Sequence, residues 1–262
     1  MIDVQLVLNL GIIGYRKHAA KLISFIEERS DCKINFIYHP TKQLEDSRFT
    51  NNFSDLYNCD AVLISSPNKT HFQYMEKLVQ NFSGYIFCEK PPGRTLSDIV
   101  RIMNAEKENP GTKLMFGFNH RYHPGVMKAK AIVDSGRMGK VIVLRGLYGK
   151  SGGNNFTKSW RNNFDISGGG ILLDQGIHMV DLMGLFCDEF VEVKSYVSNS
   201  YWKHDVEDNV YAIMRDRKGR IALLHSSATQ WQHRFALDIA LTEGYLELRG
   251  LLSGSKSYGE EK

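Results

Sequence analysis

The chain has 262 residues, of which 42% are hydrophobic and 11% aromatic, so it can bury the core of one large or two modest domains. Its formal net charge is only +4 and its basic residues are interspersed with acidic ones, which predicts neither a nucleic-acid nor a membrane-surface partner. No apolar stretch approaches the roughly 20 residues of a membrane span, and the N-terminus lacks the basic flank of a signal peptide. The four cysteines form no C-x-x-C pair, which favours reduced thiols in a cytoplasmic protein.

The first half of the chain alternates between strand patterns and helix patterns. Short apolar runs predict five strands, and apolar residues at helical spacing predict the helices between them. Such alternation indicates βαβ units in a doubly wound parallel sheet, which we assign to a dinucleotide-binding Rossmann domain of residues 1–121. The predicted strands cover residues 4–8, 32–40, 60–66, 84–93 and 113–121, and the predicted helices cover 16–30, 72–82 and 96–109.

The pattern changes after Arg121. A connecting helix is expected over 124–136 and a strand over 140–149, and strand patterns dominate from residue 191 onward. Turn sequences such as DRKGR and TEG join several of these strands, which favours antiparallel hairpins. We therefore predict a second, α+β domain over residues 122–262 with a mainly antiparallel open sheet.

A glycine-containing segment follows the first predicted strand. Asn9-Leu10-Gly11-Ile12-Ile13-Gly14 has the spacing of the G-x-G-x-x-G fingerprint with asparagine in the first place. Asparagine tolerates left-handed backbone angles, so the turn can survive the exchange. This predicts cofactor contacts from Asn9, Gly11, Ile12, Ile13 and Gly14, with an ordinary strand-to-helix turn as the alternative.

The end of the second predicted strand bears on which cofactor is bound. A strand that grips the ribose hydroxyl of NAD ends in Asp or Glu, whereas His39 and Lys42 stand here. Basic residues suit the 2′-phosphate of NADP, which gives NADP a slight preference over NAD. Both side chains could instead be solvated loop residues.

Lys90 lies in the segment FCEKPPG at the end of the fourth predicted strand. Ligands of open α/β sheets bind outside the carboxyl ends of the strands, so Lys90 is placed where the reactive end of a cofactor would lie. Pro91 and Pro92 restrict the backbone that directs it. A surface lysine before a proline turn is also common.

The segment SGGGILLDQGIHMVDLMGLF carries a cluster of ionisable residues. If it is helical, Asp174 and His178 lie at i and i+4 with Asp181 three residues later, on one side of the helix. Three roles compete: a metal site, a structural hydrogen-bonded histidine, and an acid–base site in which His178 moves a proton. No further ligand pair accompanies the cluster, so we predict no metal.

Several motifs together resemble one known family. They are GIIG, AVLISSPNKTH, EKPP, GFNHRYHPG, SWRNN and GGGILLDQGIHMVDL, and the resemblance runs from about Val4 to Gly250. The chain resembles the glucose–fructose oxidoreductase, myo-inositol dehydrogenase and rhizopine catabolism (Gfo/Idh/MocA) family. The resemblance implies a Rossmann domain followed by an α/β domain whose open sheet often forms an oligomer contact.

The resemblance also implies roles for residues. Lys90 would polarise the substrate oxygen, Asp174 would orient the substrate and His178 would be the general base. The predicted sites are as follows: for the cofactor, in addition to those above, Ser66, Pro67, Asn68, His71, Glu89, Lys90 and Asn119; for the substrate, Lys90, Arg121, Tyr122, Trp160, Arg161, Asp174 and His178.

The expected function is NAD(P)-dependent hydride transfer to or from a secondary alcohol or carbonyl of a sugar, cyclitol or nucleotide sugar. Two alternatives stay open: a non-catalytic or regulatory dinucleotide-binding homologue, and another reaction such as imine or enone reduction or NAD-assisted glycoside cleavage. The expected partners are a polyhydroxylated small molecule and further copies of the chain. Family members usually continue beyond the SGSKSYGEEK at which this chain stops, so we expect it to be either naturally short or truncated.

Overall fold

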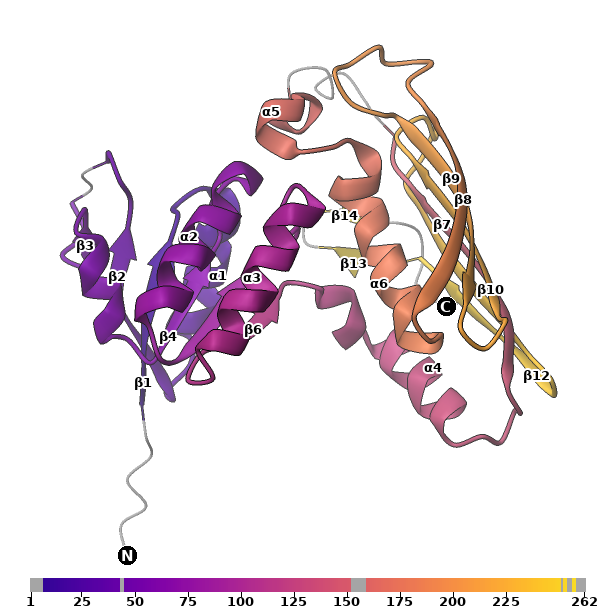
Figure 1. The fold of residues 1–262 in the computed structure, drawn as a ribbon, viewed down its shortest axis with the longest axis horizontal. Helices are drawn as coiled ribbons and strands as arrows, with labels where there is room; N and C mark the ends of the chain where they lie inside the picture. Colours follow the sequence, from indigo (N-terminus) through magenta and orange to yellow (C-terminus); the bar gives the residue numbers. More distant parts are fainter. Residues whose placement is uncertain (1–6, 43–44, 152–158, 251, 254–255, 258–262) are drawn as a thin grey trace, which may run out of the picture. The chain divides into compact units, whose positions relative to one another are not determined.

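The computed structural model describes residues 7–42, 45–151, 159–250, 252–253 and 256–257 (Figure 1). The chain divides into two compact units, residues 1–117 and 118–262, whereas the domain boundary was predicted after Arg121. Among the described residues, no helix combines the length and the apolar character needed to cross a membrane.

The N-terminal unit is built on a six-stranded parallel sheet of order β3-β2-β1-β4-β5-β6. The chain winds outward in one direction from β1 to β3 and in the other from β4 to β6, so the order reverses between β1 and β4, where ligands of such sheets bind. The predicted doubly wound parallel sheet is confirmed. The strands are β1 (Leu8–Ile13), β2 (Cys32–Tyr38), β3 (Phe49–Thr50), β4 (Ala61–Ile64), β5 (Tyr85–Cys88) and β6 (Lys113–Phe116).

Helices cover both faces of this sheet. On one face, Ile23 of α1 (Lys17–Glu27) packs against Ile12, Ile34 and Ile37 of β1 and β2. On the other face a larger core joins the sheet to α2 (Asn68–Asn81), α3 (Leu96–Glu108) and the 3₁₀ segment η1 (Phe53–Asn58). Neighbouring β1 residues enter different cores because successive side chains of a strand point to opposite faces. This two-sided burial explains why the strand sequence is almost continuously apolar.

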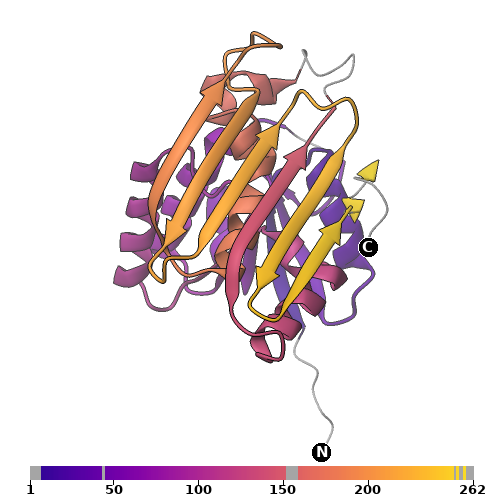
Figure 2. The same ribbon diagram turned by 90° about the vertical axis from the view of Figure 1, so that its right-hand side faces the viewer.

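The C-terminal unit contains a second six-stranded sheet, of order β12-β11-β7-β10-β9-β8 (Figure 2). Only β7 and β10 run parallel, so the predicted mainly antiparallel sheet is confirmed. The strands are β7 (Val141–Gly149), β8 (Phe190–Ser198), β9 (Asn209–Asp216), β10 (Ile221–Ser227), β11 (Arg234–Leu241) and β12 (Gly244–Arg249). A short pair, β13 (Leu252–Ser253) and β14 (Lys256–Ser257), follows.

One face of the second sheet packs against helices. Met179, Leu182 and Met183 of α6 (Ile177–Phe186) and Val126 of α4 (Pro124–Asp134) form its core with the inward side chains of the strands. The other face of the sheet is open, as the view in Figure 2 shows. The remaining short segments are η2 (Asn119–Tyr122), η4 (Trp160–Asn162), α5 (Phe164–Ser167) and the wide, π-helical turn η5 (Leu172–Gly176) that leads into α6.

Candidate active site and cofactor site

The turn between β1 and α1 differs from the predicted one. Asn9, Gly11, Ile12 and Ile13 lie inside β1, so only the last residue of the six-residue segment, Gly14, belongs to the turn. Asn9 is the second residue of the strand, and its side chain donates to Asp60 and accepts from Asn35. A side chain at Gly11 would collide with Leu56. Ile12 and Ile13 are fully buried. The strand thus extends five residues further than expected, and contact of these four residues with a cofactor stays a prediction.

The residues that form this turn start at Gly14. Gly14 has φ +109°, and a Cβ there would lie 2.7 Å from the Ser65 carbonyl oxygen, so only glycine fits. In the register G-x-G-x-x-G/A, Arg16 then takes the second place and the fully buried Ala19 takes the third. Arg16 is also the N-cap of α1, and no side chain caps that helix end. The turn fits a dinucleotide site with one exchanged glycine.

His39 and Lys42 follow β2 at the same edge of the sheet. His39 Nδ1 accepts hydrogen bonds from the backbone N–H groups of Thr41 (3.3 Å) and Lys42 (3.1 Å). The pKa of His39 is lowered by burial and then by the charges of Lys42 and Arg16. No acidic residue stands at the end of β2, so the basic character predicted for this end is present in the fold.

Glu89 and Lys90 follow β5, also at the carboxyl edge of the parallel sheet. Glu89 Oε1 lies within hydrogen-bond distance, 2.8 Å, of His18 Nε2 of α1, and the Glu89 side chain lies against Gly117 beyond β6. The Lys90–Pro91 peptide bond is cis. The side chain immediately before Lys90 is thus held by α1.

The buried ring of His71 holds the loop that follows Lys90. The ring lies within hydrogen-bond distance of two carbonyl oxygens, 2.8 Å from that of Pro91 and 2.7 Å from that of Ser66, and the residue is only 1% exposed. Burial lowers the pKa of His71, and its contacts with these carbonyls oppose that effect. Both ring nitrogens face the backbone of the two loops, so the His71 ring holds these loops, and its predicted contact with a cofactor stays a prediction. Ser66, Pro67 and Asn68 form the β4–α2 connection that His71 holds.

Asp174 lies in the C-terminal unit on the wide turn η5. Its carboxylate pairs with Arg161 Nε at 2.9 Å and Lys150 Nζ at 3.4 Å. The Arg161 guanidinium also lies over the Trp160 ring, 4.5 Å from its centroid. Two of the predicted substrate residues are thus joined to Asp174 in one cluster. Lys150 was not predicted, and it carries no motif by which the sequence could have revealed it.

His178 is buried on α6 and stacks on His120, with ring centroids 3.9 Å apart and planes 10° apart. His120 Nδ1 lies 2.8 Å from Asn119 Oδ1, and its Nε2 lies 3.1 Å from the Tyr148 hydroxyl. An amide oxygen on one side and a hydroxyl on the other satisfy a neutral imidazole, which donates from Nδ1 and accepts at Nε2. Sequence reasoning missed His120 and Tyr148, although His120 stands inside the quoted motif GFNHRYHPG.

Arg121 and Tyr122 belong to η2. The Arg121 guanidinium forms two hydrogen bonds to Asp181, of 2.7 and 2.5 Å, and this carboxylate raises the pKa of Arg121. Asp181 is therefore engaged by Arg121. The Tyr122 side chain is 61% exposed.

The wide turn changes the geometry predicted for this region. Backbone hydrogen bonds of η5 run from i to i+5, since the Ile177 N–H reaches the Leu172 carbonyl. The expectation of one regular α-helix through Asp174, His178 and Asp181 was therefore wrong. Such turns are rare and occur frequently at functional sites. Among the described residues, no three His, Cys, Asp or Glu side chains gather closely enough to hold a metal ion.

Family models match both units. A model described as "Oxidoreductase family, NAD-binding Rossmann fold" matches residues 8–118, and a model of the "GFO/IDH/MocA C-terminal domain" matches residues 126–247. The two matches together span almost all of the described chain.

The chain is also similar to individual proteins of known sequence or structure. The chain is 28% identical over 148 residues to an inositol 2-dehydrogenase of Salmonella paratyphi B, which is 53% of this chain and 44% of that enzyme. It is 24% identical over 257 residues to the 2,7-anhydro-N-acetylneuraminate hydratase of Escherichia coli K12, covering 92% of this chain and 67% of that protein. A solved levoglucosan dehydrogenase in complex with NADH and levoglucosan shares the fold, with a TM-score of 0.83, 23% identity, and coverage of 93% of this chain and 73% of that one. The chain thus spans less than half the length of the inositol 2-dehydrogenase.

Proposed function

Because the chain belongs to the Gfo/Idh/MocA oxidoreductase family, we propose that it transfers hydride between a nicotinamide cofactor and a secondary alcohol or carbonyl. The substrate class is a sugar, cyclitol or nucleotide sugar, in line with the names of its relatives. The observation that carries the proposal is the position of Lys90. It leaves the carboxyl edge of the same parallel sheet whose β1–α1 turn supplies Gly14, which is where open α/β sheets bind dinucleotides.

The proposed chemistry divides among three residues. Nicotinamide supplies the hydride chemistry when it is bound. The Lys90 ammonium stabilises the negative charge that develops on the substrate oxygen, and His178 accepts the hydroxyl proton. Asp174 orients the substrate, with its own carboxylate held by Lys150 and Arg161.

The residues proposed to hold the cofactor come from the carboxyl edge of the N-terminal sheet. They are Gly14, the β4–α2 loop of Ser66, Pro67 and Asn68, and Glu89 with Lys90; Asn119 is added from the C-terminal unit. The basic His39 and Lys42 favour NADP over NAD, although the matched family model is described as NAD-binding.

Polar and aromatic side chains support a polyhydroxylated substrate. Trp160 and the exposed Tyr122 offer ring faces, and Arg161 offers hydrogen-bond donors. Such groups can stack on the apolar faces of a sugar and hydrogen-bond to its hydroxyls. Arg161 could also meet a carboxylate or phosphate of a nucleotide sugar. We further propose that the protein acts in the cytoplasm as a homo-oligomer.

A second candidate is another reaction on the same fold, such as imine or enone reduction or NAD-assisted glycoside cleavage. The relative that matches nearly the whole chain is named a hydratase and not a dehydrogenase, which is the observation in its favour. Net reduction of the cofactor by a polyol would support the dehydrogenase, whereas a tightly bound cofactor without net turnover would support the second candidate. A cofactor-binding homologue without catalysis is the third outcome.

The first experiment is calorimetric titration of the purified chain with NADH and NADPH, followed by a screen of polyols. Lys90→Ala is expected to lower kcat by about 10²–10³ while the Kd of the cofactor changes much less. Lys113→Ala is the matched control, because Lys113 starts the neighbouring strand β6 at the opposite, amino edge of the sheet. If neither cofactor binds to folded protein, the proposal is overturned.

A further inference from the structure

The loop that joins β5 to α3 carries Lys90 and is fastened at both of its ends. At its start, the Glu89 N–H donates to a carbonyl of β4 at 2.9 Å, and the Glu89 carboxylate lies 2.8 Å from His18 Nε2. At its end, the Asp98 carboxylate of α3 accepts from two backbone N–H groups of the loop, at 2.9 and 3.2 Å. Lys90 lies between these ends, so contacts in the middle of the loop decide how its backbone is directed.

His71 of α2 supplies a contact in the middle of this loop. Its Nδ1 lies 2.8 Å from the Pro91 carbonyl oxygen, and the residue is only 1% exposed. Pro91 directly follows Lys90. A proline fixes its own φ and also restricts the residue before it, so few free backbone angles lie between this carbonyl and Lys90. A contact at the Pro91 carbonyl therefore restrains the direction in which the Lys90 side chain extends.

The ring of His71 carries a single proton near neutral pH. Burial is the largest effect on its pKa and lowers it; the two carbonyl contacts and Glu89 oppose burial, and the charge of Lys90 lowers the pKa further. A histidine whose pKa lies below its ordinary value of about 6.5 is neutral at about pH 7.5. A neutral ring has one N–H, so it donates to only one of its two carbonyl neighbours.

Burial also decides which carbonyl receives that proton. Nε2 lies 2.7 Å from the Ser66 carbonyl oxygen at a partly buried contact, whereas the contact between Nδ1 and Pro91 is buried. Water can replace a donor at the Ser66 carbonyl, but the buried Pro91 carbonyl has no such substitute. Because a buried acceptor without a donor costs free energy, the single proton belongs on Nδ1, which donates to Pro91.

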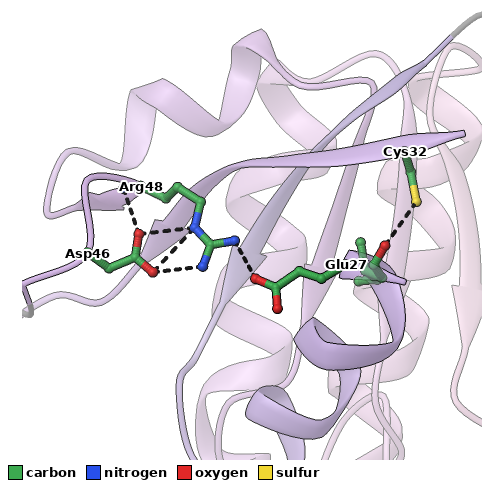
Figure 3. A network of polar contacts seen from close by, with 5 residues as sticks. Glu27, Cys32, Asp46 and Arg48 are labelled. Carbon is green, nitrogen blue, oxygen red and sulfur yellow. Dashed lines mark hydrogen bonds and ion pairs between the residues drawn. The ribbon is translucent and has the colours of Figure 1, made fainter. Parts of the chain in front are cut away.

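The turn before β3 is fastened in a different way. Arg48 donates to Asp46 and to Glu27 of α1, as Figure 3 shows, and the three side chains are between 25% and 48% exposed. Such partly exposed ion pairs contribute little to stability, and water can replace them. We therefore expect loss of His71 to displace the loop of Lys90, whereas solvent compensates for loss of Arg48.

We propose that His71 is a positioning residue for Lys90. Its Nδ1–H donates to the Pro91 carbonyl and so fixes the backbone from which the Lys90 ammonium reaches the substrate oxygen. The inference rests on the proposed function, in which Lys90 stabilises the charge on that oxygen. His71 acts in this role only through the backbone of the loop.

Two variants separate the two contacts of the ring. The amide nitrogen of asparagine is as many bonds from Cβ as Nδ1, and that of glutamine is as many bonds from Cβ as Nε2. His71→Asn thus keeps a donor for Pro91, and His71→Gln keeps one for Ser66. At saturating cofactor and substrate, we expect kcat to stay within a few-fold of the wild type in His71→Asn. In His71→Gln it should fall by about 10²-fold, because a misplacement of about 1 Å costs that much in rate.

Two controls separate this role from a general loss of stability. Both His71 variants lose the buried imidazole, so their melting temperatures should fall alike, whereas their kcat values should differ. KM for the polyol should change by only a few-fold in both variants, because His71 acts through Lys90. Arg48→Gln removes the fastening of another loop in the same unit and should leave kcat unchanged.

A nitrogen-15 spectrum of the imidazoles gives a readout that needs no turnover. At about pH 7.5 we expect the proton of His71 on Nδ1, with its signal among the 9 histidines identified by its loss in His71→Asn. A proton on Nε2 would overturn the inference. So would an active wild type whose His71→Asn and His71→Gln variants have equal kcat. A wild type that binds no dinucleotide and oxidises no polyol overturns the proposed function instead, and the spectrum then still decides whether His71 holds the Pro91 carbonyl.

Discussion

The stacked rings of His120 and His178 show how a single residue can position a proposed base. Both nitrogens of His120 have partners, Asn119 on one side and Tyr148 on the other, so the ring cannot turn without losing both contacts. Its ring stacks on that of His178, with 3.9 Å between the two ring centroids. We therefore expect His120 to be a positioning residue that holds the His178 imidazole in the orientation in which it accepts a proton.

Substitution of His120 tests this role. His120→Ala removes the supporting face, and because a misplacement of about 1 Å can cost on the order of 10²-fold in rate, kcat should fall by about that factor. KM should change by only a few-fold, since no substrate contact is assigned to His120. His120→Phe keeps an aromatic face and should recover most of kcat, as measured by steady-state kinetics on the polyol found in the screen. An alanine variant as active as the wild type, with its fold checked by circular dichroism, would contradict the role.

At the same scale, Asn9 and Arg16 show what the sequence could and could not predict. NLGIIG and GYRKHA both carry fingerprint-like spacing, and only the extent of β1 decides between them. The continuous apolar run Leu10–Ile13 is what a strand buried on both faces requires, and it is the signal that could have placed the turn after Gly14. The neighbours of His120 and Lys150 could not be predicted, because their contacts join segments far apart in the chain.

Among the secondary-structure elements, regular ones were predictable and irregular ones were not. The βαβ order and the antiparallel hairpins follow from periodicity and turn residues, which are local in sequence. The wide turn over Leu172–Gly176, with its i to i+5 bonds, has no such signature in the local sequence. Glu207, 35 residues along the chain from Leu172, accepts hydrogen bonds from the N–H groups of Gly170 and Leu172 and so anchors the start of this turn.

The β9–β10 hairpin carries a pH-dependent contribution to stability. Asp216 is 2% exposed and accepts hydrogen bonds from the N–H groups of Asp188, Lys218 and Arg220 and from Arg220 Nε. Burial alone would raise its pKa, but these donors outweigh burial and lower the pKa to about 2. A carboxyl whose pKa is lowered in the folded state stabilises fully above its unfolded pKa, near 4, and that contribution disappears as the pH falls towards 2.

Asp216→Asn should therefore destabilise the protein at pH 7 and much less at about pH 2.5. The lowered pKa of Asp216 corresponds to about 2 kcal/mol of the free energy of unfolding at neutral pH. The variant should therefore melt about 4–8 °C below the wild type at that pH. Scanning calorimetry at both pH values measures the gap, that is, the difference in melting temperature between the wild type and the variant. Glu243→Gln, in the exposed β11–β12 turn, is the control and should show no gap at either pH. A gap for Asp216→Asn of the same size at both pH values would contradict the assignment.

For the molecule as a whole, we expect copies of the chain to associate through the open face of the second sheet. Cross-strand neighbours Tyr196 and Tyr211 are 83% and 46% exposed, and Ile213 beside them is 54% exposed. They line a groove of about 1140 Å³ on this face. Six strands of about eight residues cover roughly 26 by 29 Å, or about 750 Å². Standard-sized interfaces bury about 600–1,000 Å² from each partner, so the area of this face lies within the range for a dimer.

We therefore expect the purified chain to be a dimer in sedimentation equilibrium at micromolar concentration, with the two open faces packed in a two-fold symmetric contact. Ile213→Glu places a charge in the middle of that contact and should shift the protein to the monomer, because burying an unpaired carboxylate is costly. Phe25→Glu is the matched control, since Phe25 is 53% exposed on α1 in the other unit and should leave the dimer intact. A monomeric wild type, or a dimer that survives Ile213→Glu but not Phe25→Glu, would show that this face is not the contact and that the groove serves another purpose.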